Sequence, residues 1–119
     1  MSTQVSDPQT PEGYVYACLL DDIPARGKKM VQISTVSVLV VACDAGLFAI
    51  EDRCPQTGRS LAHGEVLDGA ITSPHSGARY DLRTGQYLGG GQWPLHSHLL
   101  VVFPLRVIDD RVYIRLTQV

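Results

Sequence analysis

The residues best suited to chemistry lie close together, between Arg53 and Gly85. This stretch holds one thiol, two imidazoles and several neutral polar side chains, in two loop-like segments that follow apolar runs and end at glycine. A thiolate or an imidazole can bind a metal ion, and a thiol beside an imidazole can act as a nucleophile with its base. The candidates are Cys54, Gln56, His63, Ser73, His75 and Ser76.

Length and composition favour one compact domain. The chain has 119 residues, of which 45% are hydrophobic and 18% charged, which suits a folded core rather than a disordered chain. A net charge of -2 with scattered positive residues argues against a nucleic-acid partner. No apolar run approaches the roughly 18 residues of a membrane span, so no membrane association is expected.

The N-terminal residues 1–13 are polar and contain prolines. They lack the positive start and apolar run of a signal peptide, so we expect a disordered lead followed by a single domain over residues 14–119. Because nothing directs export, the expected location is the cytoplasm.

The rest of the pattern is typical of β-strands. Strands are expected over residues 14–20, 30–34, 36–43 and 46–52, with short ones after Cys54 and a final hairpin turning at Asp109-Asp110. In the last strand, apolar side chains alternate with Arg111, Tyr113 and Arg115, which predicts one buried face. No segment repeats apolar residues at helical spacing. The sequence therefore predicts an all-β fold of stacked antiparallel sheets.

Three cysteines without a CxxC motif predict free thiols. Cys18 and Cys43 fall in apolar strand-like runs and are expected in the core. Cys54 differs because it lies in a loop, between Arg53 and Pro55.

Several segments together resemble one family. "GLFAIEDRCP", "LAHGEVLDGAI", "SGARYDLRTG" and "PLRVIDDRVYIRL" follow the order and spacing of the Rieske-type ferredoxins, from about Val15 to Leu116. The resemblance implies a small Rieske-type domain. Its two-loop cluster-binding subdomain would span about residues 52–88.

The family's cluster site is Cys-x-His in the first loop and Cys-x-x-His in the second, and these residues hold a [2Fe–2S] centre. By this resemblance the four positions are Cys54, Gln56, Ser73 and Ser76, and only the first matches. An amide and two hydroxyls are poor ligands for such iron near neutral pH. We therefore expect a vestigial site with no catalytic residue, no metal and no cofactor, closed by a polar network; the alternative is a bound [2Fe–2S] cluster.

The first functional hypothesis is a cluster-free accessory or regulatory protein that binds an oxygenase or reductase component. Its partner surface would include His63, His75, Trp93 and Pro94, near the loop tips. Whether Trp93 packs in the core or at an interface stays open.

Two other functions are considered. One is a genuine Rieske ferredoxin that carries electrons to a ring-hydroxylating oxygenase. The other is a small enzyme in which Cys54 is the nucleophile and His63 or His75 the base. A mononuclear metal site from the same three residues, or from His96 and His98, is a further alternative.

Overall fold

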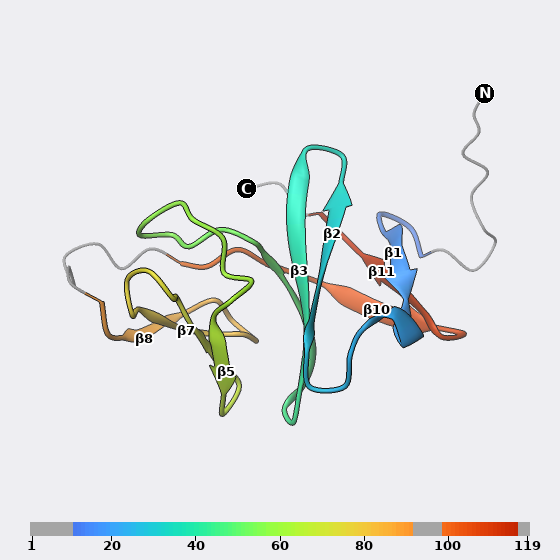
Figure 1. The fold of residues 1–119 in the computed structure, drawn as a ribbon. Coiled ribbons are helices and arrows are strands. Elements are labelled where there is room, and N and C mark those ends of the chain that lie inside the picture. Colours follow the sequence, from blue (N-terminus) through green and yellow to red (C-terminus); the bar gives the residue numbers. More distant parts are fainter. Residues whose placement is uncertain (1–10, 92–98, 117–119) are drawn as a thin grey trace.

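The computed structural model describes residues 11–91 and 99–116 (Figure 1). In these ranges the chain forms eleven strands and one short 3₁₀-helix, η1 (Leu20–Asp22). The strands are β1 (Val15–Leu19), β2 (Lys28–Ile33), β3 (Val36–Cys43), β4 (Gly46–Glu51), β5 (Glu65–Leu67), β6 (Ala70–Thr72), β7 (Arg79–Asp81), β8 (Tyr87–Gly89), β9 (Val102–Phe103), β10 (Leu105–Ile108) and β11 (Arg111–Ile114).

The strands form three antiparallel sheets. The first has the order β1-β11-β10, the second β2-β3-β4-β9 and the third β5-β6-β7-β8. Figure 1 shows the β2–β3 hairpin standing between the first sheet on one side and the third sheet on the other. We call these the terminal sheet, the central sheet and the loop sheet.

Strand β3 is buried on both of its faces. Val38 and Val40 pack into a core with the terminal sheet, and both are 0% exposed. Leu39 and Val41 point the other way, into a second core with the loop sheet. Since successive side chains of a strand alternate between faces, an unbroken apolar run is what a strand between two cores requires.

Tight turns fix the register of two hairpins. Cys43 pairs with Gly46 across the turn between β3 and β4, and Gly46 has the positive φ (133°) expected of it. Asp109 and Asp110 connect β10 to β11 with φ values of 53° and 63°. Positive φ at both central residues is the mark of a two-residue turn that matches the twist of the flanking strands.

The structure confirms the all-β prediction and most of the expected strands. Strand β3 has the predicted bounds, whereas β9 and η1 were not separately predicted. Tyr113 was expected on an exposed face, but it is only 1% exposed. The ring of Tyr16 packs edge-on against it, with 6.1 Å between the two ring centroids.

The three cysteines are free thiols, as predicted, and the predicted burial is confirmed for Cys18 but not for Cys43. Cys18 is buried, Cys43 is only half-buried, and the loop residue Cys54 is 0% exposed. Most of the expected N-terminal lead, together with Trp93, Pro94, His96 and His98, lies outside the described residues.

Within the two described ranges, no helix is long and apolar enough to cross a membrane.

The double burial of β3 gives a stability prediction. Leu39→Ala should lower the free energy of unfolding by about 2–5 kcal/mol, because it leaves a cavity between the central and loop sheets. The control is Met30→Ala, since Met30 is the cross-strand partner of Leu39 but is 55% exposed. Urea denaturation compares the two. Equal losses for both variants would contradict a packed core on this face.

Candidate functional site

The first loop, residues 52–64, is closed by its own hydrogen bonds. The Asp52 carboxylate accepts bonds from the Ser60 hydroxyl (2.8 and 2.9 Å) and from the Leu61 N–H (2.7 Å). The Cys54 N–H donates to the Arg59 carbonyl at 2.7 Å, and the Gly58 N–H donates back to the Cys54 carbonyl at 2.7 Å. These bonds turn the chain back on itself and place Cys54 inside the loop.

The second loop, residues 73–78, is a tight turn between β6 and β7. The Ser73 N–H donates to the Ala78 carbonyl (2.8 Å), and the Gly77 N–H donates to the Ser73 carbonyl (2.9 Å). The Ser73 hydroxyl accepts bonds from the N–H groups of His75 and Ser76, both at 3.4 Å. The Ser76 hydroxyl accepts one from Ala78 at 3.1 Å. Both serines therefore stabilise the backbone of their own loop.

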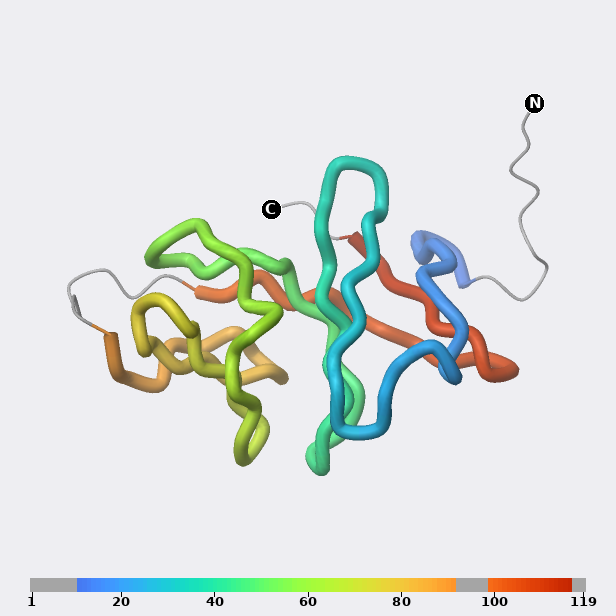
Figure 2. Tube along the Cα trace, in the orientation of Figure 1, coloured from blue at the N-terminus to red at the C-terminus, as the bar shows by residue number. Residues whose placement is uncertain are grey.

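The two loops meet at one end of the molecule (Figure 2). The Cys54 Sγ lies 3.9 Å from the Ser76 Oγ. The segment Gly89–Gly91 passes beside both loops. A Cβ built on Gly91 would lie 2.9 Å from the Gln56 Oε1, and one built on Gly90 would collide with the Gly77 carbonyl oxygen. Glycine at these positions allows three segments to approach one another closely.

The surroundings of Cys54 favour its thiolate. Burial raises the pKa of the thiol, but hydrogen bonding by the side chains of Ser73 and Thr57, and by the backbone of Thr57 and Gln56, outweighs it and leaves the pKa below its ordinary value. Tyr80 lies nearby in the same core and is 0% exposed. Burial, and then the negative charges at Cys54 and Tyr87, raise the pKa of Tyr80 to about 12.

The predicted polar closure forms only in part. Ser76 contacts Cys54, and Ser73 caps its own loop while also favouring the thiolate. The Gln56 Nε2 is buried without a hydrogen-bond partner among the described residues, and so is the Tyr80 hydroxyl. Tyr80 was not among the predicted site residues. Its position in the segment "ARYD", directly after the second loop, was the signal available.

The structure does not assemble the proposed catalytic pair. His63 and His75 are both exposed, whereas Cys54 is fully buried. Within residues 11–91, the side chains that contact the Cys54 thiol are those of Ser76, Ser73 and Thr57, and neither histidine is among them. Across the part of the chain that the structure describes, no group of three or more His, Cys, Asp or Glu could hold a metal ion.

An all-β fold of three sheets, with two loops closed around a buried cysteine, defines a Rieske-type protein. The chain belongs to the Rieske-like [2Fe-2S] domain family, whose sequence profile matches residues 13–115. The resemblance seen in the sequence is thereby confirmed.

Two ferredoxins of dioxygenase systems are similar over nearly the whole chain. The 3-phenylpropionate/cinnamic acid dioxygenase ferredoxin subunit of Photorhabdus laumondii subsp. laumondii is 28% identical over 105 residues, covering 87% of this chain and 95% of the relative. The ferredoxin of carbazole 1,9a-dioxygenase from Nocardioides aromaticivorans IC177 superimposes with a TM-score of 0.74 at 18% identity, covering 85% and 95% of the two chains.

A further structure contains a complex of reduced oxygenase and oxidized ferredoxin in carbazole 1,9a-dioxygenase. The matched chain has a TM-score of 0.73 and 21% identity, and the match covers 88% of this chain and 94% of that one. At this level of identity the two solved structures establish the fold.

The comparisons contradict the expectation that the protein has no cofactor. The matched family is described as a [2Fe-2S] domain, and the relatives are ferredoxins, so a [2Fe–2S] cluster is the cofactor that accompanies this fold. The expectation rested on four side chains alone, whereas the family match covers residues 13–115, including both closed loops.

The donor atoms of this chain still differ from the family's ligands. The four positions supply one thiol, one amide and two hydroxyls, and both hydroxyls already accept bonds from their own loop. Neutral oxygen ligands are harder than the thiolates and imidazoles of a Rieske centre. The residues present therefore do not fit that ligand set.

The contact of the glycine segment with the second loop is testable. Gly90→Ala should unfold more easily than Gly89→Ala by about 1–3 kcal/mol, because its new Cβ would collide with the Gly77 backbone. Gly89 is a matched control, since it also has a positive φ (116°) but has nothing within 4 Å of an added Cβ. Thermal unfolding measures both variants. A Gly89→Ala loss as large as that of Gly90→Ala would show that φ alone matters.

The thiolate of Cys54 gives a prediction about pH. In metal-free protein, absorbance at 240 nm should show one thiol ionising below the usual pKa of cysteine, about 8.5. Ser73→Ala should move this step to higher pH, because it removes the first of the interactions that lower the pKa. Cys54→Ser should abolish the step.

The sign of the linked stability follows from the lowered pKa. The folded state favours the Cys54 thiolate, so this contribution is fully present above the ordinary cysteine pKa and is lost as the pH falls through the lowered one. Ser73→Ala should therefore reduce the gain in stability that wild type shows as pH rises across this window. An unchanged ionisation step in Ser73→Ala would refute the assigned role of Ser73.

Proposed function

We propose that the protein is a ferredoxin-type component of an oxygenase or reductase system, and that it docks on its partner as an accessory or regulatory protein through the end that carries the two loops. The observation that carries the proposal is the convergence of the first loop, the second loop and Gly89–Gly91 at one end of the molecule. Docking of this kind needs no step through a cluster.

The loop end has the properties of a preformed contact surface. Its backbone is held by bonds within each loop, including Cys54 N–H to Arg59 and Ser73 N–H to Ala78. A surface that is already ordered loses little conformational entropy on binding. His63 and His75 are exposed on the two loops and offer polar contacts to a partner. Trp93 and Pro94 belong to the proposed surface but lie outside the described residues.

The comparisons supply the class of partner. The Photorhabdus relative is the ferredoxin subunit of a dioxygenase, and a similar chain occurs in a complex with an oxygenase. We therefore expect the partner of this chain to be an oxygenase or a reductase component.

Binding to a purified component tests the proposal. The chain should capture an oxygenase or reductase component from its host, and the two purified proteins should then bind in calorimetry. His63→Ala with His75→Ala should weaken binding by up to about tenfold, the loss of a modest interface contact. Val107→Ala is the control, because Val107 is exposed on β10 of the terminal sheet. Failure to bind either class of component would refute the proposal, and an equal effect of Val107→Ala would contradict a contact surface at the loops.

A second candidate function is a ferredoxin that carries electrons to a ring-hydroxylating oxygenase. The names of the relatives and the lowered pKa of Cys54 support it, since a thiolate is the form that binds iron. Expression with intact cluster assembly decides between the two. A red-brown protein with two irons per chain would favour the carrier, and a colourless protein that still binds its partner would favour the accessory role.

A further inference from the structure

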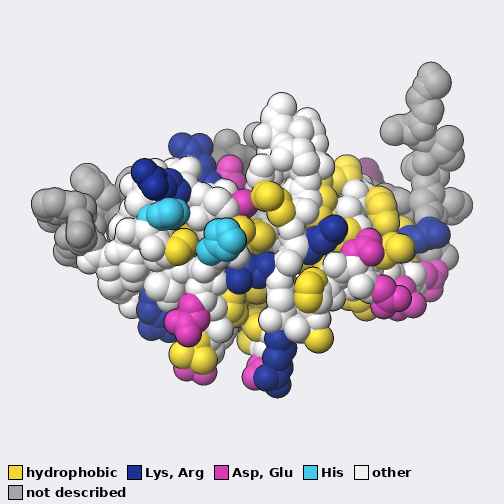
Figure 3. Space-filling view, in the orientation of Figure 1, with side chains coloured by type: hydrophobic (Ala, Val, Ile, Leu, Met, Phe, Trp, Pro, Cys, Tyr) yellow, Lys and Arg dark blue, Asp and Glu magenta, His cyan; other side chains and the backbone are white. Residues whose placement is uncertain are grey.

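The exposed charged residues of the two loops are arginines. Residues 52–64 and 73–78 contain Arg53, Arg59, His63 and His75, and their single carboxylate, that of Asp52, is half-buried. All four side chains belong to exposed residues. In the space-filling view, Lys or Arg and His side chains lie next to one another over this end (Figure 3). The two loops together therefore have a small excess of positive charge, although the whole chain has a net charge of -2.

Within the part of the chain that the structure describes, neither Arg53 nor Arg59 belongs to an ion pair. The ion pair between Arg26 and Asp44, at 2.9 Å, lies outside both loops. Arg53 lies along the first loop, where a Cβ built on Gly58 would be 3.8 Å from its Nε. The nearest acid in the sequence is Asp52, and its carboxylate accepts bonds from Ser60 and Leu61. Asp52 offsets one charge but leaves both guanidinium groups available.

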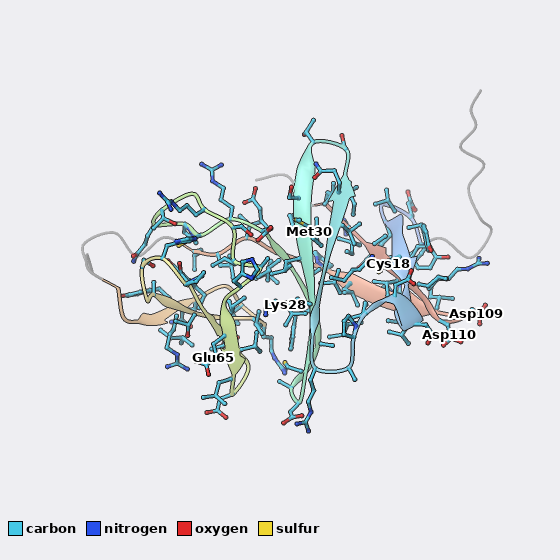
Figure 4. All side chains as sticks on the ribbon, in the orientation of Figure 1. Cys18, Lys28, Met30, Glu65, Asp109 and Asp110 are labelled. Carbon is cyan, nitrogen blue, oxygen red and sulfur yellow. The ribbon has the colours of Figure 1, made fainter. Side chains whose placement is uncertain are left out.

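Acidic residues gather at the other end of the molecule. Asp21 and Asp22 of η1 and Asp109 and Asp110 of the last turn are all exposed. A bond from the Leu20 N–H to the Asp110 carbonyl (2.8 Å) holds the two segments together. Arg111 adjoins them and offsets one of the four charges. Figure 4 shows Asp109 and Asp110 on the side of the molecule opposite the loops.

From this separation of charge we propose that the loop end binds an acidic face of a protein partner. The acidic end of the chain would be repelled by that face and would therefore disfavour binding in the reverse orientation. The inference rests on the proposed docking function and specifies the charge of the surface that receives the chain. Opposite charge on the partner would attract the loop end and repel the acidic end, so the encounter is oriented before contact. A protein face fits better than a nucleic acid, because the cationic surface is small and the net charge of the chain is negative.

A charged peptide tests the surface without the natural partner. In NMR titrations of the full chain at low salt, a short oligoglutamate should shift the backbone signals of residues 53–59, His63 and His75. A short oligolysine should instead shift those of Asp21, Asp22, Asp109 and Asp110. Both sets of shifts should fade at high salt, because exposed charges are then screened. Oligoglutamate shifts elsewhere, or none, would overturn the proposal, as would stronger loop-end shifts with single-stranded DNA of equal charge.

A matched pair of variants separates local charge from net charge. Arg59→Glu should abolish the oligoglutamate shifts at the loops, whereas Arg106→Glu makes the same change in net charge on β10 of the terminal sheet and should keep them. The Arg106 Cζ lies 6.0 Å from the centre of the Tyr14 ring, so replacing Arg106 removes a contact. The stability of both variants is therefore measured as well. Equal loss of the shifts in both variants would overturn the proposal. Salt-sensitive self-association of the wild type would also overturn it, because a second copy of this chain would then bind the loop end.

Association with the oxygenase or reductase component distinguishes this inference from the proposed function. At low salt, Arg59→Glu should slow association about tenfold while Arg106→Glu leaves it within about twofold. Binding that is insensitive to salt and to Arg59→Glu would overturn the acidic-face inference and leave docking intact. Oligoglutamate binding at the loops without binding to any such component would overturn the docking function instead.

Discussion

The structure depends on one strand, β3, whose two faces are buried in two different hydrophobic cores. In β3, Val38 and Val40 pack toward the terminal sheet and Leu39 and Val41 toward the loop sheet. Strand β4 continues the arrangement, with Ala49 in one core and Ile50 in the other. Because apolar side chains are buried on both sides, the central sheet contributes hydrophobic stabilisation to both cores. The loop sheet is held in place by this strand pair.

The loop end is ordered by the protein's own groups. Backbone hydrogen bonds close each loop, and in the second loop serine hydroxyls accept hydrogen bonds from backbone N–H groups. The absence of side chains in Gly89–Gly91 lets this segment pack beside the loops. Each hydrogen bond contributes only about 1 kcal/mol net, so the end is stabilised by their number and by the packed core below it. Cys54 lies where the two loops meet, and the hydrogen-bond donors around its thiol lower its pKa.

The sequence predicted the fold nearly completely because its signals are local. The apolar run of β3 and the pair Asp109-Asp110 each specify their structure without distant information. The burial of Cys54 and Tyr113 could not be predicted in this way. Cys54 is covered by a loop that closes on itself, and Tyr113 by a ring from β1, so both depend on residues distant in sequence or on loop geometry.

The role of the predicted site residues stays a prediction, although the structure brings the two loops that carry them together. Cys54, Gln56, Ser73 and Ser76 do come from the two loops that meet, and His63 and His75 are exposed there. Tyr80 was missed, because its pattern is that of any buried strand residue and only the approach of β7 to Cys54 gives it a role. The prediction of no cofactor was wrong because it followed from four side chains, whereas the family match extends over residues 13–115.

The two cores also divide the molecule into units that need not open together. Detaching the loop sheet would expose Leu39, Val41 and Ile50 but would leave the opposite faces of β3 and β4 packed against the terminal sheet. Amide protons of β5–β8 would then exchange with solvent through partial openings that β3 never experiences. A partner bound at the loop end would thus contact the half of the protein that opens most easily. Its binding would first slow the hydrogen exchange of the amides in β5–β8.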